Sequence, residues 1–181
     1  MQKNWGFLIV AFIVMIFTEI ALICCRKMAR KVPVNYILLL IFTLCESYLV
    51  ANICSYYAIS QPGIVIMSGL GTALITLACT LYAFFTKTDF TMMGGMIWLL
   101  AMSLLILVLF SFLFVWNTFL YNCIIAFCIF LMGIFLIYDT QLIVGKGKHK
   151  LSLDDYVIGA LLIYTDIITI FLYLLALLGK K

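Results

Sequence analysis

Long apolar stretches, separated by short polar ones, follow one another along the whole chain. Six of these stretches are 21 to 26 residues long, and each contains at most one charged residue. A helix rises about 1.5 Å per residue, so roughly 20 apolar residues cross the ~30 Å hydrocarbon core of a bilayer. The pattern therefore predicts six transmembrane helices, over residues 5–25, 36–59, 64–85, 94–115, 119–144 and 156–178.

The predicted fold is an all-α integral membrane protein with a single transmembrane domain, residues 1–181. The stretches are too long for barrel strands and do not alternate in polarity. The chain is 67% hydrophobic and 10% charged, whereas a soluble domain is roughly 45–50% apolar. The first stretch exceeds the ~7–15 apolar residues of a secretory signal, so we expect it to be a retained span.

Basic residues lie mostly at one set of helix ends, which predicts the orientation, because Lys and Arg are retained in the cytosol. The loops after the first, third and fifth stretches should therefore be cytosolic. The net charge of +4 then reflects topology, and we expect no nucleic-acid partner. The predicted cytosolic side contains Arg26, Lys27, Arg30, Lys31, Lys87, Lys146, Lys148 and Lys150, and the opposite side contains Lys3, Lys180 and Lys181.

Four acidic residues lie inside apolar stretches that contain no basic residue: Glu19, Glu46, Asp139 and Asp166. Each opposes membrane insertion by ~2.5–3.5 kcal/mol at the centre of a span, unless it is protonated, paired or cation-bound. Asp166 and Glu46 are near mid-membrane, and we expect a proton or cation site at them. The alternative for Glu46 is a protonated acid that bonds a neighbouring helix. For Glu19 we favour an interfacial carboxylate that reaches water.

Two carboxyl groups brought together in a low dielectric share one proton, so such a pair can respond to pH. When both are ionised, they offer the hard oxygen ligands that calcium prefers. A calcium pathway gated by protonation is the concrete form of this hypothesis.

Hydroxyl residues recur at four-residue spacing in the third stretch, as Ser68, Thr72, Thr76 and Thr80. Small hydroxylated residues allow close helix packing, which we favour over lining of a polar path. Thr169 shares a helix face with Asp166 and has the same two interpretations. The seven cysteines have no metal-site spacing, so we expect no cofactor.

Four segments resemble the Bax inhibitor motif, or lifeguard, family: residues 33–36 (PVNY), 81–91 (LYAFFTKTDFT), 137–141 (IYDTQ) and 163–168 (IYTDII). The resemblance covers about residues 29–179. It implies a seven-helix membrane fold, of which the first helix has no counterpart here, with the last helix central in the bundle. It also implies calcium leak from intracellular stores and suppression of cell death.

The resemblance further implies that Asp139 and Asp166 form a hydrogen-bonded pH sensor and bind calcium transiently. Some family members have a basic latch for the first of these acids, for which Arg26 and Arg30 are the candidates here. Geometry alone does not predict the contact. In a straight, symmetric hairpin Ile158 would be level with Asp139, which leaves Asp166 about 12 Å deeper.

The favoured function is a pH-sensitive, calcium-permeable leak channel or cation/proton exchanger of the endoplasmic reticulum or Golgi, with the plasma membrane as the alternative location. A second candidate is a non-transporting regulator that binds membrane proteins of the cell-death machinery. An intramembrane aspartyl protease is disfavoured, because Asp166 does not follow Gly-x-Gly and the chain lacks a Pro-Ala-Leu segment. We therefore expect no enzymatic activity.

Overall fold

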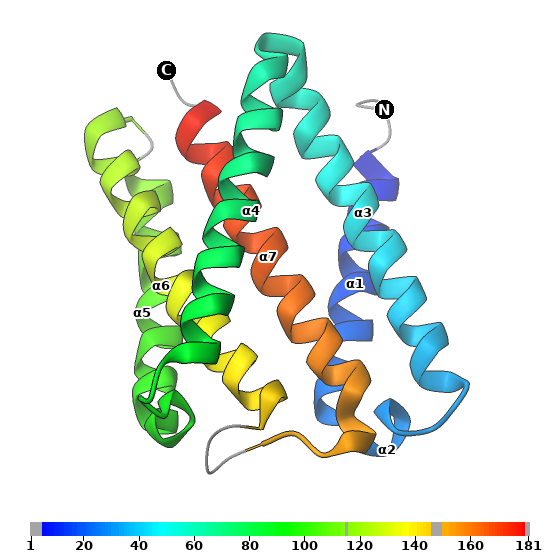
Figure 1. The fold of residues 1–181 in the computed structure, drawn as a ribbon. Coiled ribbons are helices and arrows are strands. Elements are labelled where there is room, and N and C mark those ends of the chain that lie inside the picture. The colour runs from blue at the N-terminus through cyan, green and yellow to red at the C-terminus, as the bar shows by residue number, and fades with distance from the viewer. Residues whose placement is uncertain (1–4, 115, 146–149, 180–181) are drawn as a thin grey trace.

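The computed structural model describes residues 5–114, 116–145 and 150–179. Six long helices run up and down as an antiparallel bundle (Figure 1). They are α1 (Trp5–Cys24), α3 (Val34–Ser60), α4 (Pro62–Phe85), α5 (Gly94–Leu113), α6 (Thr118–Val144) and α7 (Tyr156–Gly179). Three short helical turns connect them: α2 (Arg26–Ala29), η1 (Phe90–Met93) and η2 (Leu153–Asp155).

All six helices are long and apolar enough to span a membrane, which confirms the predicted fold class. Their ends differ from the predicted spans by at most two residues. Local signals explain several ends. Pro62 opens α4, where its missing N–H costs nothing. The Asn117 side chain accepts from the Leu120 N–H and caps α6, which ends at Gly145 with a φ of 71°.

The last helix, α7, is at the centre of the bundle and contacts α1, α3, α4 and α6. The α1–α3 hairpin covers one side of α7, and α4 and α6 cover the other (Figure 1). Helix α5 is peripheral and packs mainly on α6. Most large apolar side chains outside the helix contacts are exposed, as expected where lipid replaces water.

The α1–α3 and α4–α5 connections, the end of α6 and the start of α7 lie at one end of the bundle, which is the lower end in Figure 1. Lys3, Lys146, Lys148, His149, Lys180 and Lys181 are outside the described residues. The cytosolic location of this end stays a prediction.

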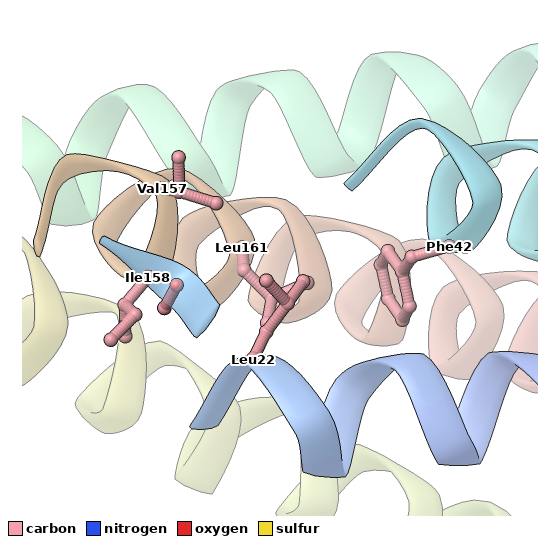
Figure 2. Packing of buried hydrophobic residues seen from close by; sticks show 6 residues of the cluster. Leu22, Phe42, Val157, Ile158 and Leu161 are labelled. Atoms are coloured by element: carbon pink, nitrogen blue, oxygen red, sulfur yellow. The ribbon is translucent and has the colours of Figure 1, made fainter. Parts of the chain in front are cut away.

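Two apolar clusters pack on α7. The cluster at the loop end joins α1, α3 and α7 through Leu22, Phe42 and Leu161 (Figure 2). The second cluster, deeper in the bundle, joins α6 and α7 through Leu136 and Ile170. The two clusters fix α7 between the halves of the bundle, and with it the position of Asp166.

Candidate functional site

The carboxyl groups of Asp139 in α6 and Asp166 in α7 lie close enough to interact directly, and the two residues are only 8% and 7% exposed. Ionised carboxylates only accept hydrogen bonds, so a hydrogen bond between the two groups requires a proton on one of them. Neither group has an ion-pair partner in the part of the chain that the structure describes. The bundle thus holds a buried carboxyl pair of the kind that is expected to share one proton.

An offset in the α6–α7 hairpin reduces the difference in depth between the two acids. Gly159 lies against Ile143, since a Cβ atom at Gly159 would be 3.2 Å from Ile143 Cγ1. Counting from this contact, the residue opposite Asp139 is Ile163, which leaves Asp166 three residues, or about 4.5 Å, deeper. Side chains lean toward the N-terminus of their own helix. In this antiparallel pair the two acids therefore lean toward each other.

The hairpin is not symmetric, so Ile158 is not level with Asp139, and the chain shows the physical reason. The Leu151 N–H donates to the Leu142 carbonyl at 3.1 Å, so the chain after the loop runs back along the end of α6. The η2 turn then adds three residues before α7 begins. These residues shift α7 along α6 and close most of the expected 12 Å gap.

Asp166 also borders a cavity of about 430 Å³ between α5, α6 and α7. Its Oδ2 atom is buried and has no hydrogen-bond partner among the described residues. The rest of the cavity wall is apolar and consists of Ala101, Leu104, Leu105, Val108, Leu109, Met132 and Phe135. One carboxyl group is therefore the polar feature of an otherwise apolar space.

The Asp139–Asp166 pair supplies too few oxygen ligands to hold a calcium ion tightly by itself. Calcium takes six to eight oxygen ligands, and the Asp139–Asp166 pair supplies at most four. Residues 5–114, 116–145 and 150–179 contain no group of three or more His, Cys, Asp and Glu side chains that could hold a metal ion. The remaining ligands would have to be water or backbone carbonyls.

Glu46 is not part of this pair. It lies on α3, half-buried, and interacts electrostatically with Glu19 of α1. The fully buried Leu22 and Phe42 lie one turn away on the same helix faces. The structure thus places two acids at the α1–α3 contact, apart from the aspartate pair. The predicted interfacial position of Glu19 does not account for this proximity to Glu46.

The hydroxyl stripe of α4 faces α3 and α7. Ser68 and Thr72 are buried, and their hydroxyls donate to the Ile64 and Ser68 carbonyls of their own helix. Such internal bonds favour the packing interpretation for these two residues. A cavity of about 630 Å³ between α3, α4 and α7 is bordered by Thr72, Thr76 and Thr80.

The predicted latch residue Arg30 is bonded to Asp155, not to Asp139. Its Nε donates to Oδ1 at 2.7 Å and its Nη2 to Oδ2 at 2.9 Å. The Nη2 also donates to Ser152 Oγ at 3.1 Å, and Ser152 donates to Asp155. These bonds raise the pKa of the Arg30 guanidinium above its ordinary value, so it stays charged. Arg26 is exposed and has no ion pair with the described residues.

Two polar residues of the recognised segments have structural roles that sequence reasoning did not assign. Gln141 connects α6 to the α4–α5 loop, since its Nε2 donates to the Thr88 carbonyl at 3.0 Å and its Oε1 accepts from the Phe90 N–H at 2.9 Å. Asn35, fully buried, donates to the Tyr156 hydroxyl at 3.0 Å and so joins α3 to α7. The sequence signal for Gln141 was its position two residues after Asp139, and the signal for Asn35 was its position in the PVNY segment.

Comparisons with known proteins identify the family and several relatives of this chain. A family model described as "Inhibitor of apoptosis-promoting Bax1" matches residues 1–181. The human "Protein lifeguard 3" is 37% identical over 99% of the chain, and the mouse protein of that name 35% identical over 99%. "Protein LIFEGUARD 3" of Arabidopsis thaliana is 31% identical over 92% of the chain and 66% of its own length.

The chain spans 58% of the length of the human and mouse proteins that it matches. No solved structure matches it significantly. The match to the family model covers the whole chain, including Asp139, Asp166 and the segments around them. The chain belongs to the Bax inhibitor family, whose lifeguard members are among its relatives.

Proposed function

We propose that this chain forms a calcium-permeable pathway, as a leak channel or a cation/proton exchanger, that is gated by protonation of the Asp139–Asp166 pair. The observation that carries the proposal is the close approach of two buried carboxyl groups between α6 and α7. A pair of this kind is expensive to maintain in an apolar bundle unless protons or cations occupy it.

Gating follows from the electrostatics of the pair. With one proton shared, the two acids hold α6 and α7 together. When that proton leaves, two negative charges face each other in a low dielectric, and their repulsion favours separation of the helices. The pathway should therefore close as the pH falls and open as it rises.

Calcium would use the same oxygens once they are ionised. The cation replaces the shared proton and neutralises the repulsion, so proton release and calcium entry are coupled. The small number of protein ligands at the pair favours rapid release. The calcium-binding residues in this proposal are Asp139 and Asp166, and no further cofactor is needed.

We place this activity in an intracellular membrane, the endoplasmic reticulum or Golgi, where calcium stores exist. Loss of stored calcium would then connect the pathway to the suppression of cell death named in the family description, "Inhibitor of apoptosis-promoting Bax1". The basic loops would lie on the cytosolic side, near anionic lipids.

Reconstitution into liposomes that contain a calcium-sensitive dye tests the proposal. The wild-type chain should admit calcium, and the rate should rise with pH. Asp166→Asn should lose both the flux and its pH response. Asp154→Asn removes an exposed acid near the start of α7 and should retain both. Flux in Asp166→Asn equal to that of the wild type would overturn the proposal.

A second candidate is a regulator that does not transport ions and acts by binding membrane proteins of the cell-death machinery. The family description names an inhibitor rather than a channel, which favours this candidate. It predicts that Asp166→Asn protects cells as well as the wild-type chain does, while neither admits calcium into liposomes.

A further inference from the structure

The cavity beside Asp166 has the size of a small-molecule site. Its volume of about 430 Å³ falls within the ~300–1,000 Å³ typical of ligand pockets. It lies where α5, which packs on α6, makes little contact with α7.

The mouth of this cavity opens toward lipid. Leu105 and Leu109 of α5 line it, and they are 54% and 58% exposed on the surface of the bundle. Both belong to a helix that is long and apolar enough to span the membrane. A ligand would therefore reach the cavity from the acyl-chain region of the bilayer.

The chemistry of the wall specifies the ligand. Asp166 borders the cavity, its Oδ2 atom is buried without a hydrogen-bond partner among the described residues, and the carboxyl pair carries one negative charge when it shares one proton. A lipid tail would match the apolar wall but leave this carboxyl group without a polar partner. A bare metal ion would match the carboxyl group but gain nothing from the wall.

We propose that this cavity binds a lipophilic amine, with the ammonium group at Asp166 and the apolar body between α5 and α6. The ammonium N–H would donate to the Asp166 carboxyl group, and the alkyl chain would cover Leu104, Val108 and Met132. The inference uses the same carboxyl group as the proposed calcium pathway, but binding does not depend on calcium flux.

Photolabelling of the full chain in phosphatidylcholine nanodiscs tests the inference. The probe is a primary alkylamine with a diazirine on its chain, and the matched control probe is the corresponding alcohol. The amine should label residues of α5 and α6 that line the cavity, and the alcohol should label them about tenfold less. This factor follows from the contribution of a charge-assisted hydrogen bond.

Two variants separate charge from shape. Asp166→Asn should reduce amine labelling at the cavity about tenfold and leave alcohol labelling unchanged. Ala101→Phe should fill the cavity and remove labelling by both probes. Its control is Leu99→Phe, on the same helix at a position that is 68% exposed. This variant should label as the wild type does.

The outcomes distinguish this inference from the proposed function. Equal cavity labelling by amine and alcohol in the wild type, or unchanged amine labelling in Asp166→Asn, would overturn the inference and identify a lipid-filled space. Charge-selective labelling in a chain that admits no calcium would support the inference and contradict the calcium pathway. Calcium flux without charge-selective labelling would support the calcium pathway and contradict the inference.

Discussion

Arg30 and Asp155 form a two-point ion pair that joins the α1–α3 connection to the start of α7. The Nε–Oδ1 and Nη2–Oδ2 distances are 2.7 Å and 2.9 Å. Arg30 directly follows α2, and Asp155 directly precedes α7. Because α7 also carries Asp166, this pair helps to fix the helix whose acid meets Asp139. Arg30, one of the two candidate latch residues for Asp139, thus binds the start of α7 instead.

Replacing Arg30 with Ala should lower the thermal stability of the solubilised chain. The Asp155 side chain is 6% exposed and would lose its charged partner, and an uncompensated carboxylate in a buried position is destabilising. Arg30→Lys should have an intermediate effect, because an ammonium group does not reproduce the two-point geometry. The measurement is the unfolding temperature in detergent, followed by circular dichroism.

The control for Arg30 is Lys27→Ala, which removes an exposed positive charge from the same segment. It should leave the unfolding temperature close to that of the wild type. If Arg30→Ala and Lys27→Ala behave alike, the ion pair contributes only surface charge and does not fix α7.

Replacing Asp139 with Asn should preserve the contact with Asp166 but remove its dependence on a proton. An amide N–H can donate to the remaining carboxylate at any pH, whereas a carboxyl group can donate only when protonated. Calcium entry into liposomes should become low and independent of pH. A steep rise of flux with pH in Asp139→Asn would mean that another group controls the pathway.

The spans could be predicted from hydrophobicity because each helix must satisfy its own backbone in lipid, whatever its neighbours are. The relative positions of the helices could not be predicted from hydrophobicity. The contact between Asp139 and Asp166 depends on the course of the chain around Leu151, and a loop of a few residues encodes this course in no periodic pattern. Family resemblance, rather than counting, predicted this contact.

The partners of individual polar residues were equally hard to predict. Arg30 was one of two candidates for a latch on Asp139, and Glu46 was a candidate for the ion or proton site. Arg30 binds Asp155 and Glu46 interacts electrostatically with Glu19. Side chains pair across helices whose rotation depends on packing of the whole bundle. The sequence identified acids that need partners but not which partner each one has.

Replacing Gly159 with Leu should separate the aspartate pair. A Cβ atom at Gly159 would already lie 3.2 Å from Ile143 Cγ1 and 3.4 Å from Leu151 Cδ1. A larger side chain must push α7 away from α6, and overpacking of this kind costs ~1–3 kcal/mol. Calcium entry should lose its dependence on pH, and the unfolding temperature should fall.

Gly159→Ala tests the same contact more gently, since Ala favours a helix over Gly by roughly 1 kcal/mol and a single methyl group needs only a small shift. Gly69→Leu is the matched control, because nothing lies within 4 Å of a Cβ atom at Gly69. The expected order of stability is Gly69→Leu above Gly159→Leu. The reverse order would mean that the α6–α7 contact at Gly159 tolerates extra volume.

Replacing Gln141 with Ala should release the α4–α5 loop from α6. The Gln141 side chain satisfies one backbone acceptor and one backbone donor of this loop, at Thr88 and Phe90. Water can reach the freed groups at this end of the bundle, so the loss should be about 1 kcal/mol or less per bond. Hydrogen exchange of the Phe90 amide should become faster, because its acceptor is removed.

A matched Gln141→Glu variant separates the two bonds. A carboxylate can still accept from the Phe90 N–H but cannot donate to the Thr88 carbonyl. Protection of the Phe90 amide should therefore persist in Gln141→Glu and be lost in Gln141→Ala, while Gln61→Ala, at the opposite end of the bundle, should leave it unchanged. Faster exchange in all three variants would indicate general loosening of the bundle rather than loss of a specific link beside Asp139.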